Sequence, residues 1–276
     1  AVEHRPGETH LIPKTANYDR NKAEQPYSLV VHYAAAGAVT YGMFKKEPRA
    51  FGPFWTYRRL IDAHLFEDPR YLQDIAMINW PGNDYRDGSI LVDSPEEQIR
   101  QLQGAKDLSL GMLFWLQHEA PRDEGGLGYP EFKLRPDIMD TADGLSKFPY
   151  IRESRRIVAI KTILEQDLIA GIHKGPRSAH YPDSVGIGHY SIDLHESKRR
   201  RKQTFEAVRP FQIPLGALIP QGTINLLAAC KNIGTTHITN GCYREHPTEW
   251  AIGEAAGTTA ALCVEQQTSP ARLRDE

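Results

Sequence analysis

The sequence predicts an α/β fold, and three features of its 276 residues carry this prediction. One long amphipathic helix stands out, and several short extended segments are interrupted by glycine and proline. Near the C-terminal end, a short apolar run is followed by a loop and a helix of small residues. Hydrophobic residues make up 40% of the chain and charged residues 25%, which is enough apolar material for a buried core.

Charge and cysteine content exclude several classes of protein. The chain has 33 Lys and Arg against 35 Asp and Glu, a formal net charge of −2, so we expect no nucleic-acid partner. No run approaches the roughly 18 apolar residues of a membrane span. Three cysteines are too few for a disulfide scaffold and favour a reducing compartment such as the cytoplasm. The polar first residues resemble no signal peptide, and a removed signal or a longer parent chain stays open.

The first half of the chain is predicted to hold an extended N-terminal segment over residues 1–30 and a region dense in aromatic residues between Phe51 and Tyr85. We expect these rings to pack in a core. The alternatives are a substrate pocket lined by the rings, or a carbohydrate-binding module that would expose them.

The clearest helix begins after Ser94. This serine is followed by Pro95 at the first helical position and by a carboxylate, Glu97, three residues after the cap. Apolar residues then recur at helical spacing up to about Glu119.

The middle of the chain is predicted to contain an extended strand from Val185 to His195, with glycines where a backbone or ligand approaches closely. The five basic residues Lys198–Lys202 are expected to form a solvated hairpin tip, with a phosphate site as the alternative.

The last seventy residues show the most informative order. Residues 225–230 read as a buried strand of a parallel sheet, residues 231–246 as a loop, and Pro247-Thr248 as the start of a helix of small residues. Gly253 and Gly257 in this helix each cost about 1 kcal/mol relative to alanine. Either tight helix packing or a closely approaching ligand would explain them, and the helix N-terminus is suited to an electron-rich group.

Two segments in this region carry a resemblance to a known family. Thr235-Thr-His-Ile-Thr-Asn-Gly-Cys-Tyr-Arg-Glu-His-Pro-Thr248, continued by Ala251-Ile-Gly-Glu-Ala-Ala-Gly257, resembles the C-terminal flavin-binding signature of the FAD-dependent oxidoreductase family, a group of glutathione-reductase-like flavoproteins. The segments 78–85, 150–156 and 191–195 are similar to further segments of that family, in the family's order.

The resemblance implies a mixed fold: a substrate-side α+β domain over residues 1–210 with its extended N-terminal segment, and residues 211–276 as the closing strand and helix of a Rossmann-like FAD-binding domain. The family's Gly-x-Gly-x-x-Gly unit does not occur in this sequence. We therefore expect a C-terminal portion, whose missing nucleotide-binding segment belongs to a longer chain or to another chain that acts as partner.

The resemblance also implies which residues form the site. Arg244 is expected to stabilise charge, and His237 to contact the flavin ring or transfer a proton. The residues expected to bind FAD are Thr236, His237, Gly241, Arg244, Thr248, Ile252, Gly253 and Gly257. The residues expected on the substrate side are Arg152, Arg155, Asp193 and His195.

The implied activity is dehydrogenation of a small organic substrate by hydride transfer to FAD. The alternative is a truncated, non-catalytic binding module that does not hold FAD on its own. Cys230, His237, Cys242 and His246 could also be read as a zinc site, but their spacing matches no well-known finger and we expect no metal. A covalent flavin link through Cys242 or His246 has no positive support in the sequence.

Overall fold

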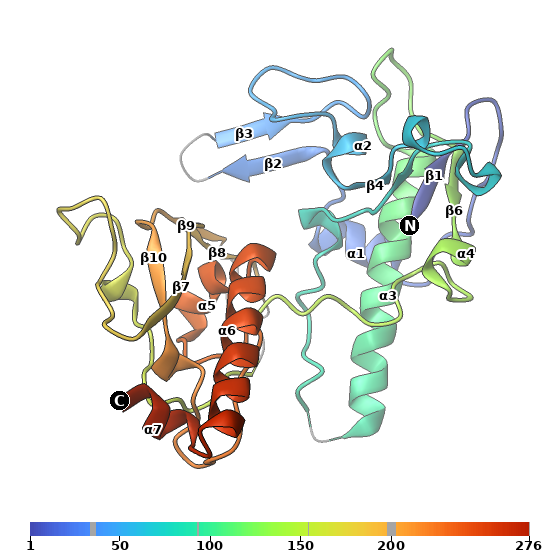
Figure 1. Cartoon of the computed structure of the whole chain (residues 1–276). Coiled ribbons are helices and arrows are strands. Elements are labelled where there is room, and N and C mark those ends of the chain that lie inside the picture. Colours follow the sequence, from blue (N-terminus) through green and yellow to red (C-terminus); the bar gives the residue numbers. More distant parts are fainter. Residues whose placement is uncertain (34–36, 93, 154, 198–202, 276) are drawn as a thin grey trace. The chain divides into compact units, whose positions relative to one another are not determined.

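The computed structural model describes residues 1–33, 37–92, 94–153, 155–197 and 203–275, and these fall into two compact units (Figure 1). The first unit comprises Ala1–Pro149 with His195–Lys202, and the second comprises Tyr150–Leu194 with Gln203–Glu276. Both units contain helices and small sheets, which confirms the predicted mixed α/β class.

The first unit is built around a four-stranded antiparallel sheet in the order β4-β5-β1-β6, with a separate β2–β3 hairpin. Its strands are β1 (Val2–His4), β2 (Val30–Tyr33), β3 (Gly37–Thr40), β4 (Arg59–Ile61), β5 (Ile75–Ala76) and β6 (Phe132–Leu134). Its helices are α1 (Tyr18–Glu24), α2 (Phe54–Tyr57), α3 (Pro95–His118) and α4 (Pro136–Met139), with short 3-10 turns η1 (Ala63–Leu65), η2 (Pro69–Tyr71) and η3 (Pro81–Asn83).

Helix α3 forms where the sequence predicts it. The Ser94 hydroxyl accepts a hydrogen bond from the Glu97 N–H, and the helix ends when Glu119 N–H bonds to the Trp115 carbonyl. The C-terminal half of the helix is buried. There the Gln117 amide donates to the carbonyls of His10 and Phe132 and accepts from the Ile12 N–H, so a buried polar group fastens the N-terminal segment and β6 to the helix.

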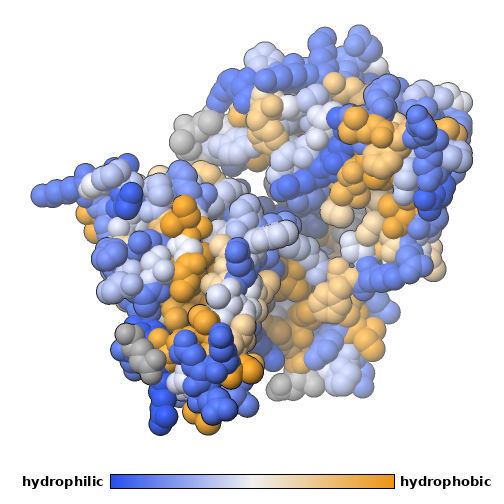
Figure 2. Space-filling view, viewed as in Figure 1, coloured by the Kyte–Doolittle hydropathy of each residue, from blue (hydrophilic) through white to orange (hydrophobic). Residues whose placement is uncertain are grey.

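The aromatic region around α2 supplies much of the first unit's core. Phe54, Trp55 and Trp80 are buried, which confirms the expected core packing for these rings. Trp55 stacks on Phe132, and the Trp80 indole N–H donates to the Ser28 carbonyl. Some residues of the region, such as Phe51 and Phe66, are exposed. Figure 2 shows that apolar patches also lie among hydrophilic side chains on the visible surface.

The second unit contains two antiparallel strand pairs, β7–β10 and β8–β9. Its elements are η4 (Glu165–Asp167), β7 (Ser184–Gly188), β8 (Ile192–Leu194), β9 (Thr204–Glu206), β10 (Phe211–Pro214), η5 (Leu215–Ala217), α5 (His237–Tyr243), α6 (His246–Glu265) and α7 (Pro270–Asp275). The extended segment predicted from Val185 to His195 is therefore two strands, β7 and β8, that pair with different partners.

Two predictions near the C-terminal end are wrong. Residues 225–230 form no strand, and Leu226 is exposed, because no described strand lies beside them to supply ladder hydrogen bonds; the Ala228 N–H instead donates to the Leu218 carbonyl. The predicted loop over residues 231–246 contains α5, whose first turn is capped by Thr236.

Two further expectations stay predictions, because the structure does not test them. The basic run Lys198–Lys202 lies outside the described residues. The predicted boundary between residues 210 and 211 separates a substrate-side domain from part of an FAD-binding domain. The division of the chain into two compact units does not test this boundary, because compactness does not show which residues bind FAD.

Gly128, in the loop after α3, offers a test of the first unit. Its φ is +79°, and a Cβ placed on it would lie 2.5 Å from the Gln117 carbonyl oxygen. Gly125 has a φ of +90° but nothing within 4 Å of such a Cβ. We predict that Gly125→Ala costs about 1–2 kcal/mol of unfolding free energy from backbone strain alone. Gly128→Ala should cost distinctly more in urea unfolding, and equal losses would contradict the described geometry.

Candidate functional site

Helix α6 packs on β7 through one face. Its buried residues, Thr248, Ile252, Ala256, Thr259 and Cys263, recur at helical spacing. Glycines in β7 make room for this contact, because a Cβ on Gly188 would lie 2.8 Å from the Thr248 hydroxyl oxygen and closer still to Phe211. The close approach suggested by the glycines of residues 185–195 is thus made by this protein's own helix and core.

The opposite face of α6 is uncovered among the described residues. Trp250 is 79% exposed and Val264 is also exposed. A Cβ on Gly257 would meet no atom within 4 Å, and one on Gly253 would meet only the Ala229 carbonyl oxygen at 3.4 Å. Packing within the second unit therefore does not require glycine at either position.

The start of α6 has no side-chain cap. Its N-cap residue is Glu245, whose side chain makes no capping hydrogen bond, and Pro247 in the first turn has no N–H. The first-turn N–H groups of a helix are normally satisfied by a cap, water or a ligand. This 20-residue helix consequently presents the positive end of its dipole without a capping side chain.

Helix α5 holds several of the predicted cofactor residues in structural contacts. Thr236 forms a capping box with Thr239 and donates its hydroxyl to the Glu165 carboxylate at 2.6 Å. Gly241 lets the helix approach β8, because a Cβ there would lie 3.1 Å from the Asp193 carbonyl oxygen. His237, the first residue of α5, is exposed.

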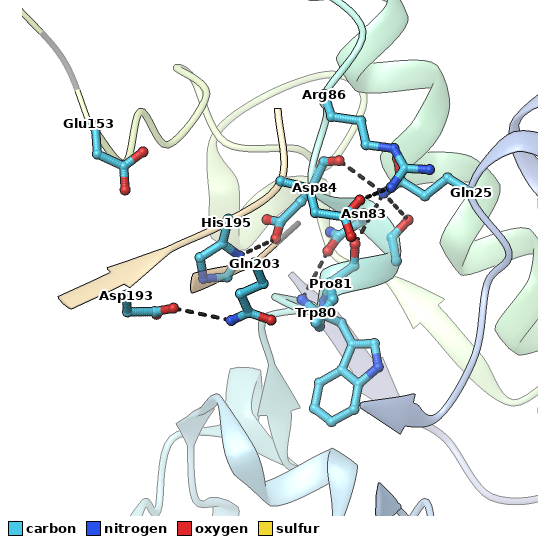
Figure 3. A network of polar contacts seen from close by, with 12 residues as sticks. Gln25, Trp80, Pro81, Asn83, Asp84, Arg86, Glu153, Asp193, His195 and Gln203 are labelled. Atoms are coloured by element: carbon cyan, nitrogen blue, oxygen red, sulfur yellow. Dashed lines mark hydrogen bonds and ion pairs between the residues drawn. The ribbon is translucent and has the colours of Figure 1, made fainter. Parts of the chain in front are cut away.

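Arg244 lies at the C-terminal end of α5 and is 3% exposed. Its guanidinium donates to the Asp193 carbonyl at 2.9 Å and pairs with the carboxylates of Glu153 at 3.2 Å, Glu245 at 3.1 Å and Asp193 at 3.5 Å. Gln203 adds a bond to the Asp193 carboxylate at 3.1 Å (Figure 3). We call Arg244, Glu153, Asp193 and Glu245 the Arg244 cluster.

His195 belongs to the first unit. Its Nδ1 lies 2.6 Å from the Asp84 carboxylate, and the two side chains are 18% and 23% exposed (Figure 3). Asp84 was not singled out in the sequence, although it lies within the segment 78–85 that resembles the family. Its local pattern reads as a turn, and only folding brings it to His195.

The two remaining substrate-side candidates, Arg152 and Arg155, lie in the segment 150–156. Arg152 is stacked over the Tyr150 ring at 5.5 Å, and Arg155 is exposed. Of the 150–156 segment, it is Glu153 that reaches Arg244.

The cysteines do not assemble a metal centre in the described part of the chain, where no three His, Cys, Asp or Glu side chains are grouped to hold a metal ion. Cys230 is exposed, while Cys242 and Cys263 are buried. Burial raises the pKa of the Cys242 thiol, and its sulfur is hydrogen-bonded to the Thr239 carbonyl. A buried thiol of raised pKa is a poor nucleophile, which speaks against a covalent flavin link at this residue.

A comparison with protein-family models identifies the family of this chain. The model described as FAD dependent oxidoreductase matches residues 4–275, nearly the whole chain. The chain belongs to the FAD dependent oxidoreductase family, which confirms the resemblance seen in the sequence and makes FAD the cofactor of the class. Comparisons with curated proteins and with solved structures gave no match. None of the described helices is both long and apolar enough to cross a membrane.

Removing the Arg244 cation should destabilise the second unit. Arg244→Met leaves the buried Asp193 carboxylate and the partly buried carboxylates of Glu153 and Glu245 without their shared partner, and we predict a loss of about 3–5 kcal/mol in urea unfolding. The control is Arg70→Met, whose partner Asp68 forms an exposed pair. It should cost at most about 1 kcal/mol. Similar losses for the two variants would show that the Arg244 cluster does not hold the unit together.

Proposed function

We propose that this chain supplies the substrate side and one wall of the flavin site of an FAD-dependent oxidoreductase, which dehydrogenates an organic substrate by hydride transfer to FAD. Membership of the family over residues 4–275 supports the class. The observation that carries the proposal is the start of α6, an uncapped helix N-terminus beside an uncovered face that contains two glycines.

These features fit the ring end of the cofactor. FAD supplies the hydride acceptor, and its ring gains electron density on reduction. The positive end of α6 would stabilise that density, and the N–H groups of its first turn would donate to it. Gly253 and Gly257 leave room for a flat group against the helix. The residues of this chain do not provide a site for the pyrophosphate of FAD, because the sequence contains no Gly-x-Gly-x-x-Gly unit.

The structure suggests different roles for the predicted cofactor residues. His237, Gly253 and Gly257 face outward and are the candidates for direct contact. Thr236, Gly241, Thr248 and Ile252 are engaged in capping and packing, so we assign them the placement of α5 and α6. Arg244 is surrounded by acceptors of this chain, and we propose that it acts as a positioning residue for the start of α6.

Asp193, Arg152 and Arg155 remain proposals for the substrate side. Asp193 is buried in the Arg244 cluster, so its contribution would be to fix β8 and the residues that follow it. Arg152 and Arg155 are cationic and lie nearer the surface, which suits an anionic group on the substrate.

The glycine face of α6 allows stability and cofactor binding to be separated. Gly253→Ala and Gly257→Ala should each raise the unfolding free energy by up to about 1 kcal/mol, because alanine is the better helix former and the space is open. If the flavin lies against this face, at least one of them should weaken FAD binding by tenfold or more, measured by quenching of flavin fluorescence in a titration of the purified chain.

Gly171→Ala is the matched control, because a Cβ there also meets nothing within 4 Å and the residue lies in a loop of the same unit. It should leave FAD binding unchanged. If both α6 variants bind FAD with wild-type affinity, the flavin does not lie against this face. A colourless wild-type chain that ignores added FAD would favour the non-catalytic module.

A further inference from the structure

A hollow in the first unit is lined by none of the residues predicted for the FAD or substrate site. Its volume is about 360 Å³, which falls within the range of roughly 300–1,000 Å³ that small-molecule pockets occupy. Its lining includes His4, Phe44, Trp55, His64, Gln73 and Asp74, a mixture of ring surface and polar groups. All of these residues belong to one compact unit, so the lining needs no contribution from the second unit.

Asp74 supplies an oriented carboxylate to this hollow. The antiparallel pairing of β1 with β5 brings His4, the last residue of β1, next to Asp74, the residue before β5. The Asp74 carboxylate accepts a hydrogen bond from the Ala63 N–H at 3.0 Å and another from the Arg59 guanidinium at 2.9 Å. Burial opposes the charged form, but these two partners outweigh it, so the pKa of the Asp74 carboxyl lies below its ordinary value. Asp74 is therefore ionised near neutral pH, and its oxygens keep lone pairs for further donors.

Three other polar side chains of the lining can both donate and accept hydrogen bonds. Burial lowers the pKa of the His4 ring and outweighs the effect of the Glu131 carboxylate, which lies 3.7 Å from Nε2. The neutral imidazole then carries one donor and one acceptor nitrogen. The side chains of His64 and Gln73 are exposed and make no hydrogen bond within the part of the chain that the structure describes. The hollow thus offers groups of both kinds beside a carboxylate that only accepts.

The Phe44 ring forms the apolar wall of the hollow. Its centroid lies 4.4 Å from that of the His4 ring and 5.8 Å from those of Trp55 and Tyr129. These neighbours hold the ring in place, while 38% of the residue stays exposed. Leu72, which is also exposed, adds an aliphatic side chain. A fixed and partly uncovered ring suits a ligand that presents C–H groups on one side.

This combination selects among classes of ligand. Asp74 would repel an anion, and a wholly apolar ligand would remove water from the carboxylate without replacing its hydrogen bonds. The ion pair with Arg59 offsets the charge of Asp74, which favours a neutral ligand over an organic cation. A neutral ring with several hydroxyl groups matches the whole lining, because hydroxyls both donate and accept while the ring C–H groups are apolar.

We propose that this hollow binds the pyranose ring of a neutral sugar. One C–H face of the sugar lies against Phe44, and its hydroxyl groups are hydrogen-bonded to Asp74, Gln73 and His4. The sugar is held without any covalent step. No residue of the proposed flavin wall takes part, so the site goes beyond the proposed function and does not rest on it.

Isothermal titration calorimetry of the full chain tests the site, with D-glucose, D-galactose, D-mannose and cellobiose as probes. At least one of these sugars should bind saturably. Phe44→Leu and Gln73→Ala should each weaken that binding by about three- to tenfold, because each removes one ring contact or one hydrogen-bonding group. The matched controls are Phe51→Leu and Gln103→Ala, which change an exposed ring and an exposed amide of the same unit outside the hollow. Both controls should bind the sugar as the wild type does.

Asp74→Asn keeps the shape of the side chain but removes its charge, and it should weaken sugar binding by about tenfold or more. Asp19→Asn is the control, because Asp19 is an exposed carboxylate of the same unit that pairs with Lys14 outside the hollow. Asp74 also holds neighbouring groups of its own chain, so circular dichroism should first show that its variant is folded. The Phe44 and Gln73 variants test the site without disturbing those contacts.

Two results would overturn the proposal. One is the absence of saturable binding for all four sugars, or equal affinities in the wild type, Phe44→Leu and Gln73→Ala. The other is binding of benzyl alcohol or benzylamine in place of the sugars, since the hollow would then be a site for aromatic compounds. These titrations contain no added FAD, so neither result bears on the proposed oxidation.

Discussion

The placement of the helices in the second unit depends on the buried guanidinium of Arg244. It joins the end of α5, the N-cap residue of α6, the main chain of β8 and the segment that contains Glu153. Arginine suits this position because its planar fork can donate in several directions at once, which the single ammonium of lysine cannot do. The desolvation cost of so many charges is offset only while the contacts persist together, so the Arg244 cluster fixes geometry more than it adds stability.

That geometry gives α6 two different faces. Thr248 and Ile252 press against β7, where glycine permits the approach, so the helix cannot rotate without losing this contact. The other face, with Trp250 and the two glycines, is then held outward. The two glycines lower the helix propensity of α6 and are not needed for packing within the unit. An external group that lies against the helix best explains them. This is the physical basis of the proposal that the flavin lies against this face.

The sequence predicted the elements whose signals are local. Helix α3 follows from Ser94, Pro95 and a regular apolar spacing, and α6 follows from Pro247 and its small residues. Helix α5 could not be found this way, because Thr239, Asn240 and Gly241 are weak helix formers and the helix exists through its packing on β8. The prediction of a strand at residues 225–230 failed because a strand needs a neighbouring strand to pair with. Composition does not reveal whether such a neighbour is present.

The same distinction between local and non-local information applies to the site. The family resemblance implied His237 as a catalytic residue and His195 as a substrate-side residue, but only the fold shows what each imidazole contacts. The His237 side chain is exposed, and no carboxylate is hydrogen-bonded to its ring among the described residues. His195 has Asp84 at Nδ1 and ordered neighbours on both sides. Proton transfer depends on a base that is already oriented when the substrate arrives. A pattern in one segment therefore cannot assign proton transfer to either imidazole, because the orientation of a ring depends on contacts that only the fold supplies.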